Sequence, residues 1–239
     1  MQELHIGEND AGQRFDKYLK KLLAEAPGSF VYKMLRKKNI TLNGKKADGT
    51  EKLSCGDEVK LFLSDETYEK LRAKSKTVMP EAFSGSEKTL RQLKVLYEDA
   101  DILIINKPSG MLSQKARPED VSANEYILSY LLREGALTEE EMRTFRPSVC
   151  NRLDRNTSGI LIAGKTLKGL QEMSKALKER TIQKYYRCVV KGEVLREDYL
   201  KGWLVKDERE NKVTVSTVKP KSADAAPIET AYRPIWTGG

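Results

Sequence analysis

The sequence Asn-Arg-Leu-Asp-Arg-Asn-Thr-Ser-Gly at residues 151–159 is followed directly by the apolar run Ile-Leu-Ile-Ala at residues 160–163. A short apolar run that begins at a Gly-containing turn predicts a buried strand, with Asp154 at its mouth. Rigid elements of this kind hold catalytic groups well. Arg152 and Arg155 favour the ionised form of the carboxylate, which suits a base or a nucleophile. A surface Arg–Asp pair in a turn is the simpler alternative, because ion pairs are common and active sites are rare.

The segments around this strand are further short apolar runs and two amphipathic helices. Strands are predicted at 93–97, 102–106, 185–191 and 213–216, and helices at 122–133 and 166–180. Strands separated by two helices and several hairpins indicate an α+β fold built on a mainly antiparallel, mixed sheet. We expect this larger domain to extend over residues 91–239.

Residues 1–63 are expected to fold as a separate, small α/β domain. Apolar side chains recur at helical spacing, Pro27-Gly28 ends the first helix, and Ser29 is placed to cap the second. The predicted elements are helices at 15–23 and from Phe30, followed by strands at 40–42 and 59–62. Residues 64–90 are polar and lack periodicity, which predicts a linker with one short helix from Glu66 to Lys74.

The positive charge of the chain is concentrated in this first domain. The formal net charge is +8 at pH 7, and residues 14–46, with ten cations and two acids, carry the same net charge. Cations that follow an apolar-faced helix and flank a Gly-Lys-Lys turn suit the tracking of a phosphate backbone. A solvated helix face is the alternative interpretation. The candidate contacts are Lys33, Arg36, Lys37, Lys38 and Lys45.

The sequence argues against a metal site and a membrane anchor. Cys55, Cys150 and Cys188 lie far apart and His5 is the only histidine, so the spacing of zinc ligands and of a disulfide framework is lacking. There is no Walker loop or GxGxxG motif for a nucleotide cofactor. The N-terminus lacks an apolar signal core, and no stretch approaches about 18 apolar residues. We therefore expect a cytoplasmic monomer that works without metal or cofactor.

Three motifs in order resemble the RluA-type family of RNA pseudouridine synthases. Arg-Leu-Asp-x-x-Thr-Ser-Gly at 152–159 is similar to the family's signature, and Asn-Lys-Pro-Ser-Gly at 106–110 to its Asn-Lys-Pro-x-Gly turn. Lys-Tyr-Tyr at 184–186 is similar to its Lys-x-Tyr motif. Residues 1–63 resemble the S-four RNA-binding module, named after a ribosomal protein. The resemblance implies the α+β pseudouridine synthase fold preceded by an RNA-binding domain.

The same resemblance implies that specific uridines in RNA are isomerised to pseudouridine, with ribosomal large-subunit RNA as the default substrate and transfer RNA as the alternative. Asp154 would be the essential group, attacking the ribose or the base covalently or abstracting a ribose proton. Tyr186 would stack on the uracil and help to remove the proton on its carbon 5. Arg152 would contact the RNA backbone or fill the space left by a flipped nucleotide. Lys107 and Lys184 are the remaining expected RNA contacts.

Two features depart from the family pattern. Asn151 stands where the family usually carries His, and an amide can still bond a turn or a phosphate. A C-terminal motif rich in Arg, Thr, His and Gln, which supplies a basic partner for the aspartate, does not occur before Gly239. We therefore expect the chain to be C-terminally incomplete. A noncatalytic RNA-binding or ribosome-assembly protein that retains the fold is the alternative function.

Overall fold

The structure, a computed structural model, describes residues 1–72, 94–207, 212–221 and 225–236. The chain divides into two compact units, Met1–Gln183 and Lys184–Gly239. The first unit contains two separate hydrophobic cores. One is formed by side chains between Leu4 and Leu71 and the other by side chains between Val95 and Ala163.

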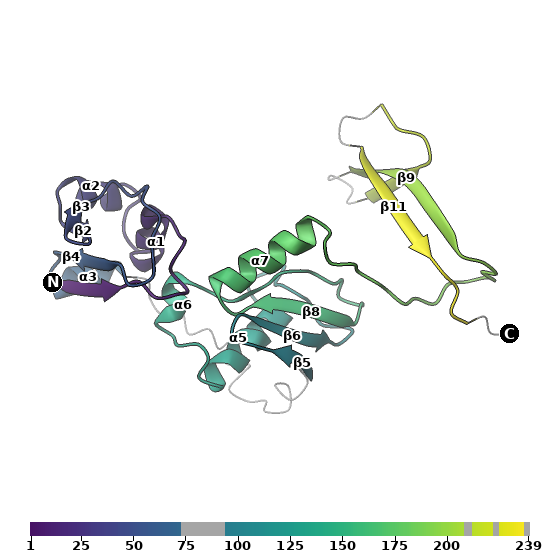
Figure 1. Ribbon diagram of the computed structural model, residues 1–239, viewed down its shortest axis with the longest axis horizontal. Helices are drawn as coiled ribbons and strands as arrows, with labels where there is room; N and C mark the ends of the chain where they lie inside the picture. The colour runs from purple at the N-terminus through teal and green to yellow at the C-terminus, as the bar shows by residue number, and fades with distance from the viewer. Residues whose placement is uncertain (73–93, 208–211, 222–224, 237–239) are drawn as a thin grey trace. The chain divides into compact units, whose positions relative to one another are not determined.

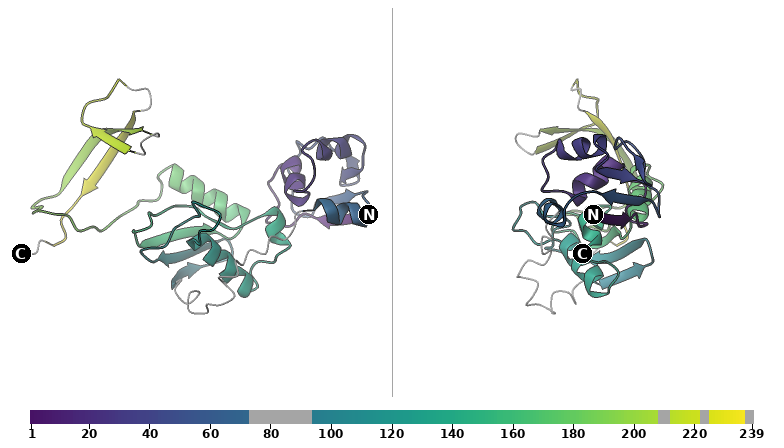
Figure 2. Two further views of the ribbon diagram at one scale, coloured as in Figure 1. Left: turned by 180° about the vertical axis from the view of Figure 1, so that it is seen from behind. Right: turned by 90° about the vertical axis from the view of Figure 1, so that its left-hand side faces the viewer.

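The N-terminal part of the first unit is a four-stranded antiparallel sheet with α1 and α2 on the same side (Figures 1 and 2). Its elements are β1 Gln2–His5, α1 Phe15–Leu22, α2 Phe30–Arg36, β2 Ile40–Leu42, β3 Lys45–Lys46, β4 Glu58–Leu61 and α3 Asp65–Leu71, and the strands lie in the order β1-β4-β2-β3. Phe15 and Leu19 of α1 and Leu35 of α2 are buried against Ile40 and Leu61 of the sheet. The predicted helices and strands of this part are all present.

Two details of this part differ from the expectations. Ser29 is the residue before α2, but its own backbone is already helical and its side chain makes no capping hydrogen bond. The short helix expected in the linker is α3, yet Tyr68 of this helix is buried and Leu71 packs on the first core. The rest of the expected linker, 73–90, lies outside the described residues.

The central part of the first unit is built on a second antiparallel sheet, in the order β5-β6-β8-β7. Its elements are β5 Lys94–Glu98, β6 Ile102–Lys107, α5 Ala123–Arg133, α6 Glu141–Thr144, β7 Ser148–Val149, β8 Gly159–Gly164 and α7 Leu167–Lys178. Because side chains alternate along a strand, Leu103, Ile105 and Leu161 share one face, where they are buried with Ile127 and Leu128 of α5. Figure 1 shows α7 running beside β8.

The second unit is a three-stranded antiparallel sheet in the order β10-β9-β11, with two long strands at its centre and one edge (Figure 2). The strands are β9 Asp198–Asp207, β10 Lys212–Ser216 and β11 Ala226–Tyr232. The strand predicted at 185–191 is wrong, because these residues belong to none of the three sheets and Val189 and Val190 are exposed. The sequence missed β9 and β11, since Gly202 and Pro227 interrupt their strand patterns.

The predicted fold class is confirmed. Every strand pair within the three sheets is antiparallel, and helices alternate with strands only in the first unit, as in an α+β protein. No helix in the described part of the chain is long and apolar enough to cross a membrane.

The close approach of α7 to the loop before β6 depends on Gly169. A Cβ atom at this position would lie 2.1 Å from the carbonyl oxygen of Asp101, a distance that real Cβ atoms do not adopt. We expect Gly169→Ala to lower the free energy of unfolding by about 1–3 kcal/mol. The same change at an open helix position would raise it by up to about 1 kcal/mol.

Thermal unfolding of the two variants Gly169→Ala and Gly28→Ala tests this expectation. A Cβ atom at Gly28 meets no other atom within 4 Å, so the second variant measures the backbone effect of alanine without the clash. Equal melting temperatures for the two variants would show that α7 can shift away from Asp101 without a loss of stability.

Candidate functional site

The topology of the central sheet brings two loops to the same end. Lys107, the last residue of β6, is paired across the ladder with Gly159, the first residue of β8. The loop 108–113 therefore leaves the sheet beside the point where the loop 150–158 enters it. The second loop connects β7 to β8 and carries Asp154, so the predicted position of this acid at the mouth of a strand is found in the structure.

Hydrogen bonds join these two loops along their length. Ser113 is buried, and its hydroxyl donates to the carbonyl of Leu153 at 2.7 Å and accepts from the amide of the same residue at 2.9 Å. The amide of Gly110 donates to the carbonyl of Arg155 at 2.8 Å, and Arg155 Nε donates back to the Gly110 carbonyl at 3.1 Å. Asp154 thus lies between two residues whose backbones are both fixed to the neighbouring loop.

Lys107 lies beneath the loops and differs from its expected role. Its side chain is fully buried, and Nζ donates to the carbonyls of Pro108, Met111 and Arg155 at 3.1, 2.7 and 3.3 Å. An ammonium group has three donors, so these bonds satisfy it. Burial lowers the pKa of Lys107, and the negative charge of Asp154 acts in the opposite direction. The prediction that Lys107 contacts RNA phosphate is therefore wrong, since the group is enclosed and serves the loops.

Asn151 closes the base of the loop that carries Asp154. Its Nδ2 donates to the carbonyl of Ile160 at 3.1 Å, and its Oδ1 accepts from the amide of Ile162 at 2.8 Å. The preceding residue, Cys150, still makes a backbone bond to β8, from its amide to the Ile162 carbonyl at 2.7 Å. The Asn151 side chain thus continues the β7–β8 ladder after the backbone has turned away.

The start of α5 supports the first loop from behind. Ala123 and Asn124 donate their amides to the carbonyls of Leu112 and Ser113 at 2.7 and 3.3 Å. Ser122 and Glu125 form a capping box at this helix end. The Asn124 side chain also accepts from the amide of Val149 in β7 at 3.0 Å, so one short segment contacts both sides of the site.

The side chains of Asp154 and Arg152 are exposed at the tip of the second loop. The carbonyl of Asp154 accepts from the amide of Thr157 at 3.0 Å, which closes a turn under the carboxylate. The hydroxyl of Ser109 donates to the carbonyl of Asn156 at 2.9 Å and fixes the far side of this turn. The loop therefore directs its internal polar groups toward the protein and presents the carboxylate to solvent.

The remaining expected catalytic contacts lie elsewhere in the chain. Lys184 and Tyr186 belong to the second unit and are exposed there, outside any helix or strand. Their pairing with Asp154 stays a prediction. Ser113 was missed, because its bonds join residues whose proximity only the folded sheet creates. For Asn151 the sequence indicated an amide able to bond a turn, but not that the amide would reach the backbone of β8.

The predicted basic contacts lie together in the N-terminal part. They are Lys33 and Arg36 of α2, Lys37 and Lys38 at its end, and Lys45 of β3, and all five are exposed. Lys38 has a φ of 59°, a left-handed conformation that ends the helix and is usually taken by glycine. RNA contact by this cluster stays a prediction.

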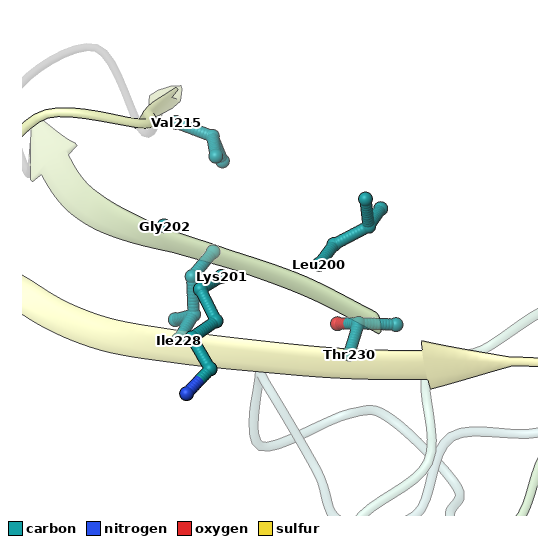
Figure 3. Close-up of a pocket in the computed structure, with 6 residues that line it drawn as sticks. All are labelled: Leu200, Lys201, Gly202, Val215, Ile228 and Thr230. Atoms are coloured by element: carbon teal, nitrogen blue, oxygen red, sulfur yellow. The ribbon is translucent and has the colours of Figure 1, made fainter. Parts of the chain in front are cut away.

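A hollow of about 210 Å³ lies on the sheet of the second unit (Figure 3). It is lined by Leu200, Lys201, Gly202, Val215, Ile228 and Thr230. Among these six residues Lys201 alone is charged, and its ammonium group pairs with Glu229 at 3.7 Å. The lining of the hollow contains no carboxylate, histidine or cysteine side chain. In the described ranges no three His, Cys, Asp or Glu side chains come together as metal ligands.

Comparison with known proteins identifies similar sequences over nearly the whole chain. The family model described as RNA pseudouridylate synthase matches residues 101–238. The chain is 30% identical to the ribosomal large subunit pseudouridine synthase C of Vibrio vulnificus, over 98% of this chain and 68% of that protein. It is 31% identical to the protein of the same name from Pasteurella multocida, over 96% of this chain and 66% of that protein.

The two hydrogen bonds between the Asn151 side chain and the backbone of β8 lead to a pH-dependent prediction. An aspartate at this position would be isosteric, but when ionised it only accepts hydrogen bonds and would face the Ile160 carbonyl without a donor. We expect Asn151→Asp to lose about 1–3 kcal/mol of stability at pH 7. The unfavourable contact between the ionised carboxylate and the Ile160 carbonyl oxygen raises the pKa of the new carboxyl above about 3.9, so the loss shrinks as the pH falls toward 4 and the proton restores the donor.

Thermal unfolding of the variant and the parent at pH 7 and pH 4 measures this change. Asn151→Ala lacks both bonds at either pH and is expected to show no recovery. Asn156→Asp adds a charge to the same loop at an exposed position and controls for charge alone. A penalty for Asn151→Asp that is the same at both pH values would contradict the role of the amide as a donor to Ile160.

Proposed function

The chain belongs to the RNA pseudouridylate synthase family, and from this premise we propose that Asp154 is the residue with which it converts uridine to pseudouridine in ribosomal large-subunit RNA. The family assignment rests on a match over more than half of the chain. It makes the protein an RNA-modifying isomerase. The ribosomal substrate follows the names of the relatives, and transfer RNA is the alternative that an assay has to test.

The reaction needs no net gain or loss of atoms. The bond between ribose carbon 1′ and uracil nitrogen 1 breaks, the uracil turns, and a bond forms between carbon 1′ and carbon 5. The proton of carbon 5 leaves, and nitrogen 1 takes up a proton. Because nothing is oxidised and no phosphate is transferred, the reaction calls for a nucleophile or base, which a positioned carboxylate provides. We expect the enzyme to act as a cytoplasmic monomer without cofactor.

The fixed loop around Asp154 is the observation that carries the proposal. The carbonyls of Leu153, Arg155 and Asn156 all accept bonds from the neighbouring loop. A backbone held on both sides fixes the Cα atom from which the intervening carboxylate projects, and such placement supports nucleophilic or basic catalysis. The geometry is compatible with attack on the ribose or the base and with abstraction of a ribose proton.

The other proposed contacts act on the target nucleotide and its neighbours. Arg152, exposed beside Asp154, is suited to the RNA backbone or to the space left by the flipped nucleotide. Tyr186 would stack on the uracil, and Lys184, two residues before it, would meet a phosphate. The basic cluster of Lys33, Arg36, Lys37, Lys38 and Lys45 would hold RNA remote from the reaction and position it without reading its sequence.

We expect Asp154→Asn to abolish product formation while RNA affinity stays within a few-fold of the parent. The amide cannot act as nucleophile or base, and the loss should be roughly 1,000-fold or more. Release of tritium from RNA labelled at carbon 5 of uridine measures turnover, and filter binding measures affinity. Asp65→Asn, at a carboxylate whose side chain is 88% exposed, is the matched control and should turn over like the parent. Normal tritium release by the Asp154 variant would refute the assignment.

The basic cluster should contribute to RNA affinity through contacts with phosphates. The double variant Arg36→Gln/Lys37→Gln is expected to weaken RNA binding and to reduce the log–log dependence of affinity on salt by about one unit per lost contact. Lys175→Gln/Lys178→Gln, which removes two cations from the last turn of α7, is the charge-matched control. If both double variants lower the salt dependence equally, the cluster has no special part in RNA binding.

A further inference from the structure

Asp16 is a buried acid whose hydrogen-bonding partners reach the surface. Its side chain is 3% exposed, and its carboxylate accepts from the hydroxyl of Tyr32 at 2.9 Å and from Arg14 Nε at 3.1 Å. Lys20 Nζ lies 3.9 Å from the same carboxylate. Tyr32 and the side chains of Arg14 and Lys20 are between 39% and 54% exposed. One buried charge therefore orders three side chains at the surface.

The position of Asp16 is itself tightly determined. Its amide donates to the carbonyl of Gly49 at 2.9 Å. A Cβ atom at Gly49 would lie 3.0 Å from the Cβ of Asp16, and the φ of Gly49 is +98°, so this position requires glycine. Burial acts to raise the pKa of Asp16, but the Tyr32 hydroxyl and the Arg14 guanidinium outweigh it and the pKa is lowered. The acid is thus a charged and immobile anchor.

Tyr32 presents its ring to solvent in a fixed orientation. Its hydroxyl donates to Asp16 and accepts from Lys20 Nζ at 3.0 Å, and that ammonium group lies 4.6 Å from the centre of the ring. Arg36 follows four residues later in α2, on the same side of the helix. An aromatic ring held at its hydroxyl end and contacted by one ammonium group loses little conformational freedom when a flat ligand stacks on it.

The hydrogen bond between Tyr32 and Asp16 is not needed simply to hold α1 against α2. Nonpolar contacts already join the helices, since Leu19 of α1 and Val31 and Leu35 of α2 are buried in the same core. Tyr32 keeps 44% of its surface exposed, so its ring is not consumed by the packing between the helices. Cations with interleaved aromatic rings are the surface that single-stranded nucleic acids select.

We propose that Tyr32, fixed by Asp16, is a stacking platform for an unpaired base of the bound RNA, with Arg14 and Lys20 on the flanking phosphates. The ligand class rests on the proposed function, since RNA is the substrate of the enzyme. The basic cluster contacts phosphates, and the platform adds a stacking contact that only an unpaired RNA base can make. Its role is therefore to favour RNA that contains a single-stranded segment in addition to the modified uridine.

Binding of two RNAs tests the proposal, an unstructured single strand of about twelve nucleotides and a duplex of the same length. Tyr32→Leu is expected to weaken binding of the single strand roughly 5- to 100-fold, as the loss of one stacked base does, without changing the salt dependence. Duplex binding should stay unchanged. Tyr32→Phe keeps the ring without the bond to Asp16 and should bind the single strand with intermediate affinity. Lys20→Gln should reduce the salt dependence by about one unit.

Tyr97→Leu is the matched control, because Tyr97 is 50% exposed and its hydroxyl also donates to a carboxylate, that of Asp99 at 2.9 Å. The proposal is overturned if Tyr32→Leu binds the single strand as tightly as Tyr97→Leu does. It is also overturned if the loss is equal for the single strand and the duplex.

A second readout remains if the leucine variant does not fold. The fluorescence of Tyr32→Trp should be quenched by the single strand beyond the change that the parent shows, and an equal change in both would overturn the platform. All these measurements are made without turnover. A parent chain that fails to release tritium would contradict the proposed turnover by this chain but would leave the binding result intact.

Discussion

Lys107 Nζ lies fully enclosed among the carbonyl oxygens of Pro108, Met111 and Arg155, and the two loops at the end of the central sheet are built around it. An ammonium group removed from water is costly unless all its protons are bonded. The loops can satisfy this group only when both are in place, so the cost of leaving it unbonded opposes any separation of them. The negative charge of Asp154 nearby adds an attraction in the same direction. The position of the Asp154 backbone thus follows from the need to satisfy a buried cation.

The pairing of Lys107 with Gly159 places this cation where both loops can reach it. Further out, Ser113 and Ser109 continue the attachment, and Asn151 fastens the base of the second loop to β8. These bonds use backbone groups that would otherwise need water. The loop backbone around Asp154 is therefore held by short polar side chains that make one or two hydrogen bonds each.

Local patterns were sufficient for the elements that carry the site. The apolar runs at 102–106 and 160–163, together with the Gly turn before residue 160, correctly predicted β6, β8 and the position of Asp154 in the turn before β8. The role of Lys107 was predicted wrongly, because a lysine after an apolar strand is usually solvated, whereas here the two loops at the end of the folded sheet enclose it. The strand expected at 185–191 was also wrong, since strand propensity requires a neighbouring strand and these residues belong to no sheet. Bonds such as that from Ser113 to Leu153, 40 positions apart, leave no local signal.

The Arg155 carbonyl, which accepts from both Lys107 and Gly110, has a consequence for engineering. The nine residues 151–159 are the recognisable motif. If they were grafted alone onto another antiparallel sheet, their carbonyl acceptors would lack the donors that the loop 107–113 supplies. The loop 107–113 would have to be transplanted with them, together with the helix end that supports it. Natural sequences face the same condition, so substitutions in one loop should be tolerated only with matching substitutions in the other. The portable unit of this chemistry is a pair of segments that are distant in the chain.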